Sequence, residues 1–272
     1  MPKTIVSTDF RGSMVMLGCG TSAGVPAIGC GCDVCQSGDP KNSRTRSSVI
    51  FGLPEGNLLI DTTPELRIQL IREQIGLVHA VAYTHEHADH IFGLDDLRLF
   101  PFIIGGPVPL YCQPQVEARI RHSFDYAFYE TPETHQGSRP RLVFETIDQQ
   151  PFDVLGARVI PIPLVHGPRI DVFGFRIGDV AYCTDVKAIT ASSMALLAGL
   201  DTLILGALRY TPHPTHFCID EAIEVINELK PRRTFLTHMG HDIDYSTAMN
   251  QLPAGIEPGY DGLRIDLGFV RD

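Results

Sequence analysis

Short apolar runs separated by Gly, Pro and polar residues predict a chain rich in strands. The runs Ser48 to Leu53 and Asn57 to Ile60 flank Pro54-Glu-Gly56 and predict a hairpin. From Arg141 to Thr184 several such runs follow one another and predict successive antiparallel strands. The other predicted strands are Met14–Gly18, Val78–Tyr83, Val108–Cys112, Val159–Val165, Val172–Ile177, Val180–Cys183, Thr202–Leu205 and Thr234–Thr237.

Apolar residues at helical spacing predict a smaller number of helices. Between Ile219 and Leu229 the apolar positions recur every three or four residues, and Thr63-Pro64 has the composition of a helix start. The predicted helices are 64–74, 114–128, 192–200 and 219–229, and residues 130–140 are expected to form a polar inserted loop. Many strands with few helices and no linker predict one α+β domain over 1–272. We expect an αββα sandwich, in which two mainly antiparallel sheets pack face to face with helices outside.

Composition restricts the classes of partner. Lys and Arg number 22 against 32 Asp and Glu, so the net charge is −10, which disfavours an extended nucleic-acid footprint. No apolar run approaches ~20 residues and the first residues do not resemble a signal peptide, so we expect a cytoplasmic protein without a membrane partner. The 7 cysteines include a cluster of three, a pattern more typical of metal binding than of a disulfide framework.

The segment His85-Glu-His87-Ala-Asp89-His90 places four metal ligands directly after an apolar run. On an extended backbone, His85 and His87 point to one side, whereas Asp89 and His90 come from the following turn and are free to face a second metal. One zinc needs only three protein ligands and a water. The segment therefore predicts two metals rather than a polar loop held by hydrogen bonds.

Three later ligand candidates also follow apolar runs: His166, Asp185 and His238. Together with the His-x-His-x-Asp-His segment, their order resembles that of the metallo-β-lactamase superfamily. The resemblance implies that one metal binds His85, His87 and His166, that the other binds Asp89, His90 and His238, and that Asp185 bridges the two. Imidazole and carboxylate ligands suit Mn or Zn, and also Fe.

The resemblance also assigns a role to Asp61, which ends the strand before the helix predicted at Pro64. In the superfamily an acid at this position accepts a hydrogen bond from a metal-binding histidine, a common supporting contact. The alternative is that Asp61 caps the helix, a role that Thr62 or Thr63 could also fill.

Cys30-Gly-Cys32-Asp-Val-Cys35 supplies three thiols in a short loop, which predicts three corners of a tetrahedral structural zinc site. The alternative is free or redox-active thiols. Here the sequence resembles the PhnP-type phosphodiesterases, in which a histidine three residues after the last active-site histidine joins the cysteines. In this chain that residue is His241, and the zinc loop spans about 29–48.

The same resemblance implies a reaction. The expected protein is a dinuclear-metal phosphodiesterase that attacks a small phosphodiester with a metal-bridging hydroxide. Asp89 and Asp185 complete the site and His216 acts as general acid, with His213 in reserve. The substrate class includes cyclic ribose phosphates and nucleotide-like diesters, and the family resemblance also implies a homodimer.

Three alternatives remain open at this stage. A tRNA 3′-processing nuclease would be expected to carry a long basic or Gly-rich arm for its substrate, and the sequence shows neither a basic run nor such an arm. A thioester or lactone hydrolase would keep the same ligands. A cofactor-handling protein, similar to those of pyrroloquinoline quinone biosynthesis, would have altered active-site ligands. Asn42 to Ser48, with Arg44 and Arg46, could contact phosphate, although packing within the loop is the favoured interpretation.

Overall fold

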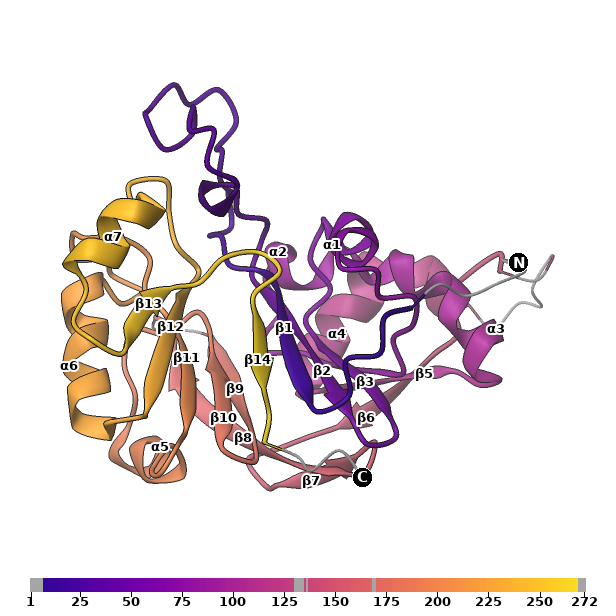
Figure 1. Cartoon of the computed structure of the whole chain (residues 1–272). Helices are drawn as coiled ribbons and strands as arrows, with labels where there is room; N and C mark the ends of the chain where they lie inside the picture. Colours follow the sequence, from indigo (N-terminus) through magenta and orange to yellow (C-terminus); the bar gives the residue numbers. More distant parts are fainter. Residues whose placement is uncertain (1–6, 130–134, 136, 168–169, 269–272) are drawn as a thin grey trace.

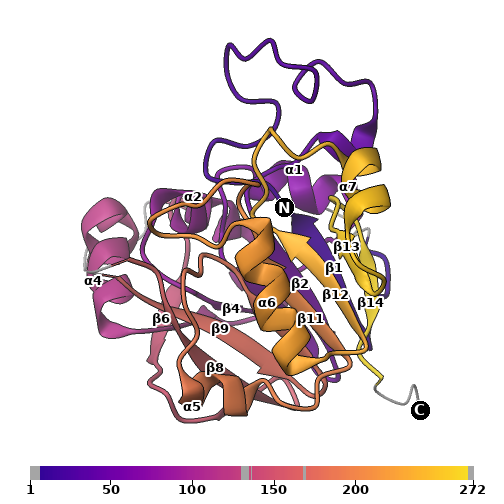
Figure 2. The same ribbon diagram turned by 90° about the vertical axis from the view of Figure 1, so that its left-hand side faces the viewer.

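Two sheets packed face to face form the centre of the molecule, with helices outside both (Figures 1 and 2). The computed structural model describes residues 7–129, 135, 137–167 and 170–268. Most of the predicted polar loop at 130–140 lies outside the described residues. The two facing sheets with helices on their outer sides confirm the predicted sandwich class.

The first sheet has the strand order β14-β1-β2-β3-β4-β5-β6. Its strands are antiparallel from β14 to β3 and parallel from β3 to β6. The predicted hairpin is β2 and β3, and the predicted strand 78–83 is shorter than expected. The strands are β1 (Ser13–Gly18), β2 (Ser48–Leu53), β3 (Gly56–Ile60), β4 (Ala80–Ala82), β5 (Val108–Cys112), β6 (Leu142–Thr146) and β14 (Arg264–Asp266).

The second sheet has the order β13-β12-β11-β10-β9-β8-β7. It is antiparallel from β7 to β10 and parallel from β10 to β13. The predicted antiparallel run over 141–184 is thus correct from β7 onward, but its first strand, β6, lies in the other sheet and pairs in parallel with β5. The strands are β7 (Phe152–Val154), β8 (Ala157–Val165), β9 (Asp171–Ile177), β10 (Val180–Cys183), β11 (Thr202–Gly206), β12 (Arg233–Thr237) and β13 (Ile256–Pro258).

Both sheets are thus mixed, and the expectation of mainly antiparallel sheets is corrected. Parallel neighbours need a crossover connection, and helices supply these connections on the outer faces. No helix among the described residues has the length and apolar character needed to cross a membrane. The helices are α1 (Leu66–Arg72), α2 (Ala88–Ile91), α3 (Phe100–Ile104), α4 (Pro114–Ser123), α5 (Ala191–Leu196), α6 (Ile219–Leu229) and α7 (Tyr245–Gln251), with 3-10 turns η1 (Pro40–Asn42), η2 (Leu94–Leu99) and η3 (Asp125–Phe128).

The helices confirm most of the sequence prediction and correct its ends. The last predicted helix, 219–229, is α6. The predicted helix 114–128 ends at Ser123 and continues as η3. The N-cap of α1 is Glu65, so neither Asp61 nor its two threonine neighbours caps this helix.

Alternating side chains explain why the strands read as continuous apolar runs. Along β1, Met14 and Met16 pack into the core between the two sheets, whereas Val15 and Leu17 pack under the helices of the first sheet. Phe175 of β9 belongs to the same inter-sheet core. A strand buried on both faces has no solvent-facing positions, so its sequence lacks the alternation of polar and apolar residues.

The carboxyl ends of several strands meet at one edge of the sandwich. The histidine-rich segment follows β4. His166 and His238 directly follow the ends of β8 and β12, and Asp185 lies two residues after the end of β10. Parallel neighbours in one sheet end at the same side, so this topology places ligand candidates that are far apart in sequence beside one another.

Candidate metal centres

The structure brings the seven predicted active-site ligands into two adjoining clusters. His85, His87, His166 and Asp185 offer ligand atoms that all lie within 4.8 Å of one another. Asp89, His90 and His238 form a second group that meets the same criterion. Each group contains imidazole nitrogens and a carboxylate, the donors that Zn, Mn and Fe accept.

Asp185 connects the two clusters through its two carboxylate oxygens. Its Oδ2 lies 3.2 Å from His90 Nε2 and 3.3 Å from His238 Nδ1. Its Oδ1 lies 3.9 Å from His166 Nε2. Because each oxygen faces a different cluster, this carboxylate has the placement required of a bridge between two cations.

Asp61 contacts the second cluster through His90, on the side of the ring that faces away from the other ligands. Its Oδ2 accepts a hydrogen bond from His90 Nδ1 at 2.7 Å, and its two oxygens also accept from the Thr84 amide and hydroxyl, each at 2.8 Å. Since the Nδ1 of His90 is occupied, its Nε2 is directed at the cluster. Asp61 therefore fixes the ring of one histidine of the second cluster.

Two other histidines are oriented by groups that sequence reasoning missed. His166 Nδ1 donates to the Thr215 carbonyl oxygen at 2.8 Å, and His85 Nδ1 lies 2.9 Å from Thr84 Oγ1. Both contacts leave the Nε2 atom facing the site. Thr84 directly precedes His85, so a contact between them could have been predicted from the sequence. The contact with Thr215 is made by a backbone carbonyl, which no residue type indicates.

Buried polar atoms in the clusters indicate that cations fit there. His90 Nε2 and His238 Nδ1 are buried and make no hydrogen bond with any described residue. Burial opposes a charge on His90, but the carboxylates of Asp185 and Asp89 outweigh it and raise the pKa of His90 well above its usual value. A concentration of carboxylates around buried imidazoles is a donor set that a divalent ion satisfies.

A cavity of about 530 Å³ opens onto the clusters. Its size is within the range of small-molecule sites, roughly 300–1,000 Å³. Sequence reasoning did not select Ser22 or Ile170 as lining residues, although the small-residue loop containing Ser22 was visible after the first strand. The lining residues are Ser22, His87, Ala88, Asp89, His166, Ile170, Asp185, Thr215, His216 and His238.

The structure separates the two candidates for the general acid. His216 lines the cavity, its ring centre 4.6 Å from that of His166 and 4.9 Å from that of His238. Burial and then His238 lower the pKa of His216 to about 3, so the free protein holds this imidazole neutral at pH 7. His213 does not line the cavity, and its Nδ1 lies 3.3 Å from the Thr215 amide.

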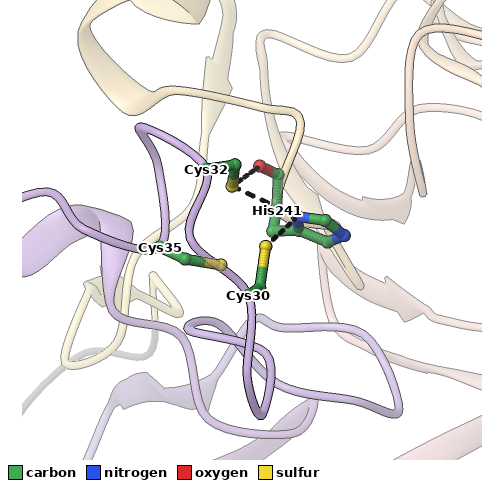
Figure 3. Close-up of side chains that lie close together, drawn as sticks. All are labelled: Cys30, Cys32, Cys35 and His241. Atoms are coloured by element: carbon green, nitrogen blue, oxygen red, sulfur yellow. Dashed lines mark hydrogen bonds between the residues drawn. The ribbon is translucent and has the colours of Figure 1, made fainter.

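Figure 3 shows the three clustered cysteines around His241. His241 Nδ1 lies 3.3 Å from Cys32 Sγ and 3.5 Å from Cys30 Sγ, and all four ligand atoms, including that of Cys35, lie within 4.8 Å of one another. The hydrogen bond with His241 lowers the pKa of Cys32 to about 6, whereas burial raises that of Cys35 to about 11. The group fits a single tetrahedral zinc, the thiols being bound as thiolates.

The loop that carries the cysteines is tied to the chain after β12. Arg44 is only 1% exposed, and its guanidinium donates to the carbonyl oxygens of Gly240 at 3.0 Å and Ile243 at 2.7 Å. A Cβ at Gly20 would lie 2.6 Å from the Arg44 carbonyl, so glycine permits this close approach. Arg44 therefore holds the loop together, and Arg46, which pairs with Glu65, is likewise engaged within the protein.

Comparisons with known proteins give the family. The family model of the β-lactamase superfamily domain matches residues 56–239. A crystal structure described as a new diphosphatase from the PhnP family has a TM-score of 0.86 and 41% identity, covering 93% of this chain and 96% of that one. The octanoyltransferase of Porphyromonas gingivalis is 36% identical over 92% of this chain and 50% of its own length. Zn²⁺-bound PqqB from Methylobacterium extorquens has a TM-score of 0.75 and 21% identity, covering 94% and 100%.

Fold and clusters together are those of the metallo-β-lactamase superfamily. The chain belongs to the PhnP family of this superfamily. It spans about half or less of the length of the curated relatives it matches.

We expect three divalent metals per chain, two at Asp185 and one at the cysteines. Both groups present full sets of ligands, so chelation should remove the metals and lower the melting temperature, because metal binding contributes to folding. Elemental analysis of protein purified without chelator measures the ratio. One metal or fewer per chain would contradict the assignment of two separate sites.

Cys32→Ala is expected to remove the cysteine-site metal alone. Loss of one thiolate weakens an ion that joins the cysteine loop to His241, so metal content should fall by about one per chain and the melting temperature should drop. Asp33→Ala is the matched control, because Asp33 is exposed in the same loop and is outside the cluster. Full metal content in Cys32→Ala would exclude a zinc site at these cysteines.

Proposed function

We propose that this chain is a dinuclear-metal phosphodiesterase that hydrolyses a small phosphodiester. The observation that carries the proposal is the position of Asp185, whose two oxygens face separate clusters of buried ligands. The 41% identity to a protein described as a diphosphatase supports phosphate ester chemistry.

The clustered ligands would hold two metal ions for the reaction. His85, His87 and His166 would hold one ion, Asp89, His90 and His238 the other, with Asp185 between them. Two such ions, when bound, lower the pKa of a shared water and offset the negative charge that develops on the phosphoryl oxygens. Mn or Zn, and also Fe, suit these ligands, and zinc suits the cysteine site.

His216 is proposed as the general acid for the leaving oxygen. It lines the cavity, and its Nδ1 lies 3.9 Å from Asp185 Oδ1. A general acid must carry a proton in the substrate complex, and the negative charge of a bound phosphodiester raises the pKa of an adjacent imidazole. His213 contacts the His216 ring, with 5.1 Å between ring centres, and is placed to orient it.

The size and charge of the cavity favour a small substrate. Its volume of about 530 Å³ suits a nucleotide-sized or ribose cyclic diester. Among the described residues the lining contains no Lys or Arg, and the net charge of −10 disfavours a tRNA-length substrate. A second candidate is a diphosphate bond, P–O–P, which the description of the 41% identical relative favours.

Asp185→Asn is expected to lower both metal content and turnover. A neutral amide is a poorer bridge between two cations, so kcat/KM should fall by more than the roughly 10–100-fold typical of losing an outer hydrogen-bond partner. Bis-nitrophenyl phosphate is a suitable substrate, and Asp179→Asn, at an exposed turn, is the matched control. Unchanged turnover in Asp185→Asn would exclude a bridging carboxylate.

His216→Ala is expected to slow the hydrolysis of alkyl diesters selectively. An alkoxide leaves poorly without a proton, and a positioned acid typically contributes 10²–10⁴-fold, whereas nitrophenolate leaves readily without one. The rates on a ribose cyclic phosphate and on bis-nitrophenyl phosphate should be compared at full metal content.

His213→Ala serves as the control for that comparison. An equal loss on both substrates in His216→Ala would assign it to binding or metal positioning instead. A selective loss in His213→Ala alone would show that the acid is the other histidine of the pair.

A further inference from the structure

β6 lies at one edge of the first sheet, next to α4 (Figure 2). It pairs in parallel with β5 on its inner side, and no described strand pairs with its outer side. With five residues it is longer than the other three edge strands, β7, β13 and β14, which have three each. Short edge strands protect a sheet from pairing with another chain, so β6 is the edge most open to such pairing.

The hydrogen bonds with β5 determine which backbone groups of β6 face outward. The Arg141 carbonyl accepts from the Val108 amide of β5 at 3.0 Å. In a parallel pair the residues of a strand alternate between facing the neighbour and facing away from it. The amides and carbonyls of Leu142 and Phe144 therefore point away from β5, and an incoming strand would hydrogen-bond with these two residues.

The side chains along this edge are complementary to those of a second copy. Arg141, Val143 and Glu145 are exposed, Val143 by 39%, whereas Leu142 and Phe144 pack against the core of the first sheet. Neither charged side chain forms a hydrogen bond or an ion pair with a described residue. In an antiparallel pair of two copies centred on Val143, Arg141 lies opposite the partner's Glu145, and the same contact occurs again by symmetry.

Backbone direction and charge select the same register. In this pairing Leu142 lies opposite the partner's Phe144, so the outward amides and carbonyls of both strands meet and exchange hydrogen bonds. Val143 and the two charged residues occupy the positions without hydrogen bonds, where opposite side chains come closest. A shift of the pairing by one or two residues would place Arg141 opposite an uncharged side chain.

A groove beside β6 has room for a second strand. Its volume is about 550 Å³, and residues 141–144 line it together with Glu117 and Arg121 of α4 and with Tyr129. Tyr129 is 52% exposed and follows η3 directly. Its ring therefore offers an incoming chain an apolar contact in addition to the strand itself.

We propose that β6 is the interface of a homodimer, in which the β6 strands of two copies pair antiparallel about Val143 and join their first sheets. Charges on edge strands commonly prevent pairing. Here the two charges have opposite signs and lie equally far from Val143, so they attract each other in this pairing and give no such attraction in shifted ones. The interface does not depend on which reaction the metal centre catalyses.

Charge reversal tests the interface on the full-length, metal-loaded chain, with the dimer dissociation constant measured by sedimentation velocity. The natural chain should sediment as a dimer and dissociate on dilution. Arg141→Glu and Glu145→Arg should each raise the dissociation constant by about tenfold or more, because each places like charges opposite one another at two symmetric positions. The double variant, which exchanges the two signs, should return the constant to near its natural value.

Arg264→Glu is the matched control. Arg264 is exposed on β14, the edge strand at the other end of the same sheet, so its reversal should leave the dissociation constant unchanged. Metal content should equal that of the natural chain in every variant, which verifies that each variant is folded.

Cysteine substitution tests the register. Val143→Cys places two thiols opposite each other with their Cα atoms about 4.5 Å apart, a separation that a disulfide spans. Oxidised glutathione should accept the two electrons and two protons of these thiols and leave a covalent dimer. Thr146→Cys, on the same strand, should not be linked, because its two copies would lie six residues, about 20 Å, apart. The natural chain under the same treatment is the control for its own cysteines.

Weakening by each reversal, its rescue in the double variant and a disulfide at Val143→Cys support the interface. A natural chain that stays monomeric at every concentration, reversals without effect, equal weakening by Arg264→Glu, or a Val143→Cys variant that forms no disulfide overturns it. Hydrolysis of bis-nitrophenyl phosphate by the natural chain is measured separately, so either result leaves the proposed function to its own tests.

Discussion

The contact on which the rest of the site depends is that of the Asp185 carboxylate with the histidines around it. Its oxygens lie 3.2 Å from His90, in the helix that follows β4 of the first sheet, and 3.9 Å from His166, which follows β8 of the second sheet. Burying a charge without partners costs several kcal/mol, so the carboxylate is tolerable only where cations or protonated imidazoles surround it. The two sheets must therefore pack with their ligand-bearing strand ends together for this residue to be satisfied.

The cysteine cluster extends this dependence to the loop after β1. His241 contacts Cys32, and only two residues separate it from His238. The buried Arg44, which follows the cysteines in sequence, donates to the carbonyl oxygen of Gly240 and so links this loop to the segment between His238 and His241. A metal bound at the cysteines would therefore fix the backbone that carries an active-site ligand, which is why a site without access to the cavity still bears on its geometry.

The sequence predicted what is encoded locally and missed what depends on chain path. Strands such as β1 were recognisable because both of their faces are buried. The parallel pairing in half of each sheet was not predictable, because an apolar run does not specify which strand it pairs with or in which direction. The ligands from His85 to His238 were found through residue type and order, with help from the family resemblance. The role of Thr215 rests on its backbone carbonyl, which accepts from His166 and which no residue pattern reveals.

Backbone geometry gives a separate indication that the site is built for chemistry. Asp61, Asp185 and His238 adopt positive φ values of 65°, 45° and 57°, a left-handed conformation that non-glycine residues rarely adopt and that costs on the order of 1–3 kcal/mol each. Glycine would adopt it freely but offers no ligand. All three lie within the ligand clusters or contact them, so the fold retains strained residues where a carboxylate or imidazole is required. Among the described residues three other non-glycine positions, Gln74, Leu155 and Lys230, also adopt positive φ, so half of these left-handed residues belong to the site or contact it.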